Sequence, residues 1–155
     1  MAIDPRFSVL VSGYTFLESP RWHNDRLWLS DFYTHQVVRV DLQGQVDKVA
    51  DVPGQPSGMG WLPDGRLLVV SMRDRKILRQ EADGRLVTHA DLSSVADGHA
   101  NDMVVDAQGS ARTAPRLAHR AQVPVNPASV ARSPNSIANG TITTMKGKAW
   151  RIPRR

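Results

Sequence analysis

Residues 57–71, SGMGWLPDGRLLVVS, and residues 19–30, SPRWHNDRLWLS, share one pattern. In both segments a tryptophan precedes a polar turn, and the turn leads into a short apolar run that ends in serine. Residues 101–111, NDMVVDAQGSA, begin a third copy. The aligned residues, which are 39 and 44 positions apart, are Trp22, Trp61 and Val105. A unit of about 40 residues with about four strands is typical of a β-propeller blade. We therefore predict an all-β propeller rather than a generic sandwich of hairpins.

Short, partly alternating apolar runs fill the first 110 residues and predict strands. The clearest runs are at residues 26–32, 36–42, 66–72 and 85–91. The turn sequences that separate them end at Gly44, Gly65, Gly84 and Gly109. We therefore predict that residues 1–110 form a partial propeller of about two blades plus the first strand of a third. A further strand is expected in residues 7–16, before the first blade. In a closed propeller a strand in this position often completes the last blade, and this sequence has no last blade.

The last segment, residues 111–155, has a different composition. It contains nine Lys and Arg residues and no Asp or Glu, whereas residues 1–110 contain 11 basic and 15 acidic residues. Half of the ten prolines also lie in this segment. Such a composition buries too little apolar area to offset the entropy of ordering the chain. We predict a divergent, disordered tail at residues 111–155, and we consider a reading-frame change or a truncation near Gly109 as a hypothesis for the abrupt change.

The composition also bears on location and partners. The absence of cysteine excludes disulfides, thiolate zinc sites and cysteine nucleophiles, and it is typical of a reducing compartment. No window approaches the roughly 18 apolar residues of a membrane span, so we expect a cytoplasmic protein without a membrane partner. The basic tail has one aromatic residue, Trp150, which offers little for stacking on bases. We therefore predict no nucleic-acid partner.

Three polar residues occupy the same place in the repeat, four positions before the aligned residues. They are Glu18, Ser57 and Asn101. Equivalent positions of successive blades converge on the central channel of a propeller, so these side chains are expected to lie close together. A carboxylate and an amide oxygen are the donors that hard cations such as Ca²⁺ or Mg²⁺ prefer. Alternatively, Glu18 is an ordinary solvated loop residue and Asn101 belongs to a turn. His99 precedes Asn101 by two residues and is a candidate for the same channel mouth.

Three stretches of this sequence carry a resemblance to a known family. They are ESPRW at residues 18–22, the run DVPGQPSGMGWLPDGRLLVVSMRDRKILR at residues 51–79, and DGHANDMVVDAQG at residues 97–109. Over residues 8–110 the chain resembles the SMP-30/gluconolactonase family, also called regucalcin-like. The resemblance implies a six-bladed propeller with one divalent metal ion in its channel. It also implies hydrolysis of sugar lactones and related esters.

The resemblance assigns roles to three residues of this chain. Glu18 corresponds to a metal-binding glutamate and Asn101 to a substrate-binding asparagine. His99 stands where many members have a substrate-contacting arginine, so the specificity for sugar lactones is open. The resemblance leaves the metal as Ca²⁺, Zn²⁺, Mg²⁺ or Mn²⁺. In the family, a further asparagine and an aspartate from later blades complete the metal site, and the aspartate transfers the proton. We find no counterpart for either, so we assign no catalytic residue.

Two functions are compatible with these features. The first is a member or fragment of a metal-dependent sugar-lactone hydrolase family, with a small lactone or ester as substrate and little or no activity as this chain. Whether the chain is an enzyme in its own right is left open. The second is a non-catalytic blade fragment that acts as a binding module or has no function. Because two blades cannot close a ring, we also expect self-association through open edges.

Overall fold

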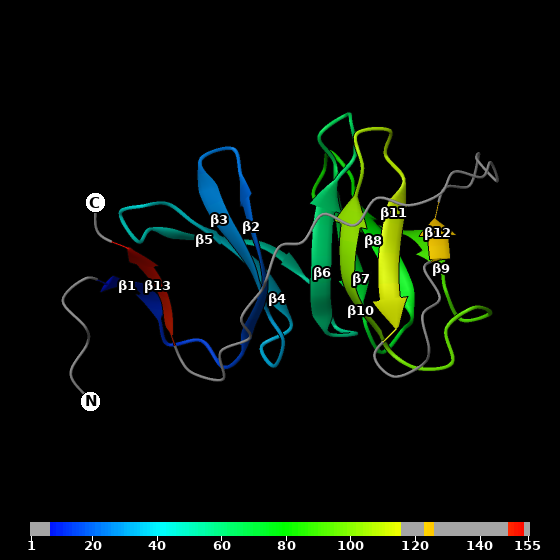
Figure 1. Ribbon diagram of the computed structural model, residues 1–155, viewed down its shortest axis with the longest axis horizontal. Helices are drawn as coiled ribbons and strands as arrows, with labels where there is room; N and C mark the ends of the chain where they lie inside the picture. The colour runs from blue at the N-terminus through cyan, green and yellow to red at the C-terminus, as the bar shows by residue number, and fades with distance from the viewer. Residues whose placement is uncertain (1–6, 116–122, 126–148, 154–155) are drawn as a thin grey trace.

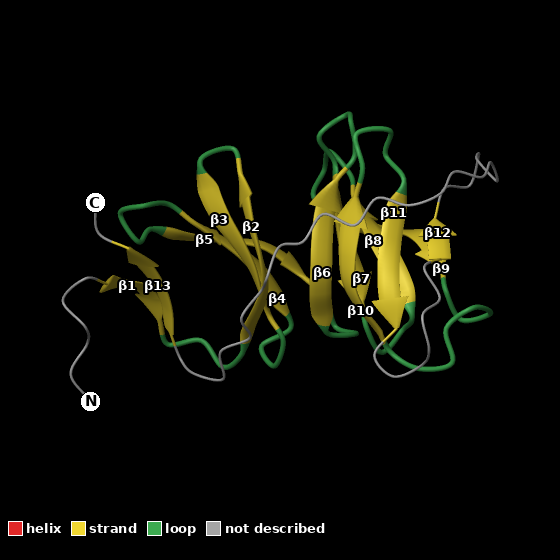
Figure 2. Ribbon diagram, viewed as in Figure 1, coloured by secondary structure: helices red, strands yellow, loops and turns green. Residues whose placement is uncertain are grey.

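The computed structural model describes residues 7–115, 123–125 and 149–153. These residues form strands joined by turns, with no helix among them (Figure 2). Accordingly, this part of the chain has no helix that is long and apolar enough to cross a membrane. The strands are β1 (Phe7–Ser12), β2 (Leu17–His23), β3 (Arg26–Asp31), β4 (Gln36–Val40), β5 (Val46–Asp51), β6 (Pro56–Trp61), β7 (Leu67–Ser71), β8 (Lys76–Gln80), β9 (Leu86–Asp91), β10 (Ala100–Val105), β11 (Ala111–Pro115), β12 (Val123–Val125) and β13 (Ala149–Pro153).

The strands form antiparallel sheets that follow the order of the chain. Two sheets have four strands each, in the orders β2-β3-β4-β5 and β6-β7-β8-β9. The third sheet is β10-β11-β12, and β1 pairs with β13 in a two-stranded ribbon. Figure 1 shows the β1–β13 ribbon at one end, the sheet β2–β5 beside it, and the sheets β6–β9 and β10–β12, which overlap in this view, at the other end. The fold is therefore an all-β, open part of a propeller, as the sequence repeat predicts.

The repeat in the sequence is also a repeat in strand register. The equivalent cross-strand pairs are Trp22–Leu27, Trp61–Leu67 and Val105–Ala111. The first, inner strand of each of these sheets has a register shift near its start, between residues 18 and 21 in β2, 56 and 59 in β6, and 100 and 103 in β10. Relative to the repeat, the shift begins one residue later in β2 than in β6 and β10. A bulge of this kind re-aims the side chains of its strand. Each inner strand is therefore irregular near its candidate residue. Glu18 still pairs with Ser30, while Ser57 and Asn101 lie inside the shift of their strands.

The apolar core is divided into layers between neighbouring sheets. Strand β7 supplies two layers, because Leu67 and Val69 pack toward the first sheet while Leu68 and Val70 pack toward the third. A further layer around Leu29 lies between the first sheet and β1. Successive side chains of a strand point to opposite faces, so a wholly apolar strand such as β7 is buried on both. Burial of each such side chain contributes about 1.5–3 kcal/mol, and the stacking of sheets is thus a main source of stability.

The third sheet extends further than the sequence analysis predicts. Strand β11 follows β10 and carries buried Ala111 and Thr113 on either side of exposed Arg112. This alternation is the period of a strand with one buried face, but the basic, acid-free composition of the segment hides it. The remaining residues of the predicted tail, 116–122, 126–148 and 154–155, lie outside the described residues, so disorder there stays a prediction.

Candidate channel site

The three candidate residues occupy equivalent places in the structure. Glu18, Ser57 and Asn101 are each the second residue of an inner strand, in β2, β6 and β10 respectively. Strand β6 packs against both β2 and β10. Ser57 is fully buried, while Glu18 and Asn101 are partly buried. One end of the three inner strands therefore presents a carboxylate, a hydroxyl and an amide.

Hydrogen bonds connect these positions from sheet to sheet. The Ser57 hydroxyl donates to Asn101 Oδ1 over 3.0 Å. The hydroxyl of Ser30, which is fully buried in β3, donates to the Ser57 carbonyl over 2.7 Å. Ser30 is in turn the cross-strand partner of Glu18. The structure thus brings Ser57 and Asn101 into direct contact. Glu18 is connected to them less directly, because it lies opposite Ser30 in the β2–β3 pair.

His99 lies in the loop immediately before β10 and its side chain is exposed. It is therefore near Asn101 in the sequence and at the same end of β10. The roles given above to His99, Asn101 and Glu18 stay predictions, because they concern a substrate and a metal ion.

An ion pair at the same site was missed by sequence reasoning. Arg21 of β2 donates from Nη2 to Asp102 Oδ1 over 2.6 Å and to the Met103 carbonyl over 2.8 Å. Arg21 follows Glu18 by three residues, and Asp102 follows Asn101 directly. The available indication was a charged residue inside β2, Arg21, and another of opposite sign inside β10, Asp102. The pairing itself depends on the bulges and on the packing of strands 81 residues apart, which the sequence pattern does not reveal.

Asp31 is a second acidic group near this end of the first sheet, and it is fully buried. Its carboxylate accepts hydrogen bonds from Thr15 Oγ1 over 2.6 Å, from the Phe16 amide over 2.9 Å and from Thr34 Oγ1 over 2.8 Å. Burial raises the pKa of Asp31, but these hydrogen bonds outweigh it and hold the pKa below its usual value. Asp31 is therefore an anion that anchors the loop before β2, and its oxygens are already engaged.

Comparison with known proteins identifies the family. Residues 16–146 match the SMP-30/gluconolactonase/LRE-like region. The chain belongs to this family. A search among curated proteins gives no match.

Solved structures support the fold of this SMP-30/gluconolactonase family member. A gluconolactonase from Xanthomonas campestris has 23% identity and a TM-score of 0.64 over 78% of this chain and 47% of its own. The calcium-binding protein regucalcin from Agrobacterium tumefaciens has 22% identity and a TM-score of 0.56 over 70% of this chain and 38% of its own. Virginiamycin B lyase from Staphylococcus aureus has 14% identity and a TM-score of 0.55 over 69% of this chain and 37% of its own. The present chain thus spans less than half the length of each.

The family implies a divalent metal ion, and the residues present meet that requirement in part. Glu18, Ser57 and Asn101 offer oxygen donors, which suit a hard cation. However, within residues 7–115, 123–125 and 149–153 no three Asp, Glu or His side chains gather as a metal-binding group. A Ca²⁺ ion takes about 6–8 oxygen ligands. The described residues of this family member therefore supply the right kind of ligand but not a complete shell.

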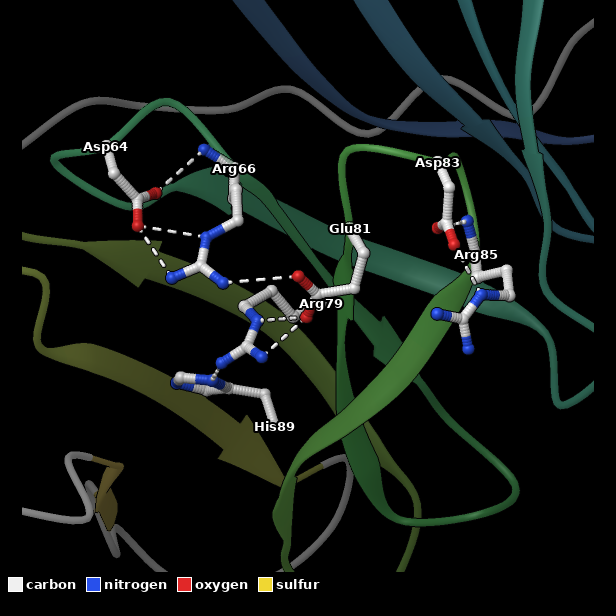
Figure 3. A network of polar contacts seen from close by, with 7 residues as sticks. All are labelled: Asp64, Arg66, Arg79, Glu81, Asp83, Arg85 and His89. Carbon is white, nitrogen blue, oxygen red and sulfur yellow. Dashed lines mark hydrogen bonds and ion pairs between the residues drawn. The ribbon is translucent and has the colours of Figure 1, made fainter.

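A larger polar network lies elsewhere in the second sheet, in the β6–β7 and β8–β9 turns and on strands β8 and β9 (Figure 3). Its members are Asp64, Arg66, Arg79, Glu81, Asp83, Arg85 and His89. Hydrogen bonds from Arg66 lower the pKa of Asp64, and those from Arg79 lower the pKa of Glu81. Each acid is paired with an arginine. The acids and arginines of this network therefore neutralise one another, and none of them lies within β2, β6 or β10, which carry the candidate site.

Proposed function

We propose that this chain is part of a metal-dependent sugar-lactone hydrolase. The observation that carries the proposal is the contact between Ser57 and Asn101 at equivalent positions of two inner strands, with Glu18 at the third, in a chain of the SMP-30/gluconolactonase family. A lactone or related ester is the substrate class. The absence of cysteine supports a reducing, cytoplasmic location as a further proposal.

Each candidate residue has a defined task in this proposal. Glu18 would hold a divalent cation, whose chemical contribution is to polarise a carbonyl oxygen. Asn101 is fixed by Ser57 and would contact the substrate by hydrogen bonding, with exposed His99 beside it. A general base within reach of the attacking water is also needed. Asp31 does not suit that task, because its oxygens accept bonds from Thr15, Phe16 and Thr34.

We expect the isolated chain to have little or no lactonase activity. Residues 111–155 contain no acidic residue that could serve as the base. A divalent-cation-dependent turnover of a gluconolactone that is lost in Glu18→Ala would show instead that the chain itself is an active enzyme.

Cation binding tests the proposal without requiring turnover. A ligand that binds only the folded state stabilises it by about 2.7 kcal/mol at 100 times its Kd, which for a domain of this size raises the Tm by roughly 5–10 °C. We expect such a shift with Ca²⁺ or Mn²⁺ in the unmodified chain, and its loss in Glu18→Gln. Asp83→Asn is the matched control, since Asp83 is an exposed acid paired with Arg85. A shift that survives in Glu18→Gln, or no shift with any cation, would contradict the metal site.

A second candidate is a non-catalytic module that binds through its open face. Val104 of β10 is 60% exposed. At the equivalent position of β6, a side chain on Gly60 would run into Val105 of the next sheet. Val104 therefore faces the place where a following blade would pack, and this face can accept another surface, including a second copy of the chain.

A further inference from the structure

Arg21 links the inner strands of the first and third sheets. Its side chain is 19% exposed and reaches Asp102, which is 42% exposed, over 2.6 Å. The same Nη2 donates to the Met103 carbonyl, and Nη1 donates to the Pro20 carbonyl over 3.0 Å. One guanidinium thus joins the bulge of β2 to the bulge of β10. Charge-assisted hydrogen bonds of this kind are stronger than neutral ones, and the planar guanidinium fixes their geometry.

The strand between them is built to allow this contact. A Cβ atom at Gly58 of β6 would lie 2.2 Å from the Met103 amide nitrogen and 2.8 Å from Asp102 Cα. A Cβ atom at Gly60 would lie 2.5 Å from Val105 Cγ2. The two glycines therefore let β10 approach β6 at backbone distance. This close approach brings Asp102 within reach of Arg21.

Several hydrogen bonds fix the polar groups of the β10 bulge. Asp102 Oδ1 accepts a hydrogen bond from the Met103 amide over 2.8 Å as well as the one from Arg21. The Asp102 carbonyl accepts a bond from the Thr113 hydroxyl over 2.9 Å. Asn101 is the residue just before Asp102, and its Oδ1 accepts the bond from Ser57. The shape of the bulge therefore determines where the Asn101 side chain points.

We propose that Arg21 is a positioning residue that fixes the β10 bulge and so holds Asn101 toward Ser57. The importance of Asn101 for a substrate rests on the proposed function. The position of the Asn101 side chain does not depend on the proposed function. The positioning role of Arg21 and the substrate role of Asn101 can therefore be tested separately.

The test uses NMR spectra of the full chain, which need neither metal nor substrate. We expect Arg21→Ala to move the side-chain amide signals of Asn101 and to speed hydrogen exchange at the Met103 amide by about tenfold or more, because a charge-assisted bond is lost. Arg21→Lys keeps the charge without the fork of donors, so it should shift the Asn101 signals less than Arg21→Ala. The matched control is Arg85→Ala, which removes a 2.6 Å pair with Asp83 that is far more exposed. It should leave Asn101 and Met103 unchanged.

Asp102→Asn is the second variant, since it keeps an oxygen for the Met103 amide but removes the charge that Arg21 contacts. If Arg21→Ala does not fold, the same spectra are recorded for Asp102→Asn, and they test the positioning role of Arg21 in its place. Displaced Asn101 signals in a folded variant support the proposal. Unchanged Asn101 signals and unchanged Met103 exchange in folded Arg21→Ala or Asp102→Asn would overturn it, and would leave the proposed function untouched.

Discussion

At the residue scale, single hydroxyl groups and aromatic rings make contacts that join neighbouring sheets. The Ser57 hydroxyl is buried and uses its proton to hold Asn101, so a small residue at this position connects two sheets. The convergence of these two residues was predictable because the sequence repeat maps them onto equivalent strand positions. The pairing of Arg21 with Asp102 was not predictable, because no repeat relates the two residues and their contact depends on a bulge.

One residue-scale prediction concerns His23 and acid. The His23 ring stacks on Trp61 with centroids 3.8 Å apart and planes at 11°. Burial lowers the pKa of His23 from its ordinary value of 6.5. The unfolded chain then binds more protons than the folded one between the two pKa values, so stability is full above about pH 6.5 and falls as pH drops through that window. We expect the Tm to decrease from pH 7.5 to pH 5.5.

The variant His23→Phe keeps an aromatic ring without a titrating group, so the Tm should fall less steeply over the same range. A residual slope is expected, because burial and the charges of Arg79 and Arg66 also lower the pKa of His89. An identical pH profile for His23→Phe and the unmodified chain would contradict this account of His23.

At the scale of elements, the positions of the strands follow from the local sequence pattern, whereas the close packing of β6 against β10 depends on glycines in β6. The runs at residues 26–32, 36–42, 66–72 and 85–91 predict β3, β4, β7 and β9 closely. Their alternation and their turns are local properties of the chain. Strands β11 and β12 were not predicted, because the composition around them resembles a disordered tail even though Ala111 and Thr113 alternate with Arg112 as a strand requires.

The close packing of β6 on β10 gives a prediction at this scale. Gly58→Ala would place a Cβ atom 2.2 Å from the Met103 amide nitrogen, which is backbone and cannot move aside alone. Overpacking of this kind costs about 1–3 kcal/mol, occasionally more. Gly98→Ala is the control, because no atom lies within 4 Å of the added Cβ. Its effect should stay within about 0.5 kcal/mol. Equal urea midpoints for both variants would show that β6 and β10 are not in backbone contact.

At the scale of the whole molecule, the described sheets form an open arrangement rather than a closed ring (Figure 1). The stability of stacked repeats comes from each unit and from the interfaces with its neighbours. The layers around Leu29, Val69 and Val70 are such interfaces. The existence of repeating blades was predictable from the period of about 40 residues. The pairing of β1 with β13 was not, since it joins distant segments that share no local pattern.

Association of chains is the prediction at this scale. Val104 is 60% exposed on the face where a following blade would pack, so we expect the mass measured by light scattering to rise with concentration. Val104→Lys should weaken this association. Val95→Lys is the control, because Val95 is also exposed but lies in the loop before β10. A monomeric mass at every concentration would exclude association through this face.

The central claim is that the second residues of three inner strands surround one site, in which Glu18 binds the cation beside Ser57 and Asn101. Titration with Mn²⁺, followed by NMR, tests it most directly, because a bound paramagnetic ion broadens the signals of the residues around it. The account predicts that Glu18, Ser57 and Asn101 broaden first and together, and that Glu18→Gln removes the effect. Broadening that is spread over exposed acids such as Asp51 and Asp83, with no preference for these three residues, would contradict it.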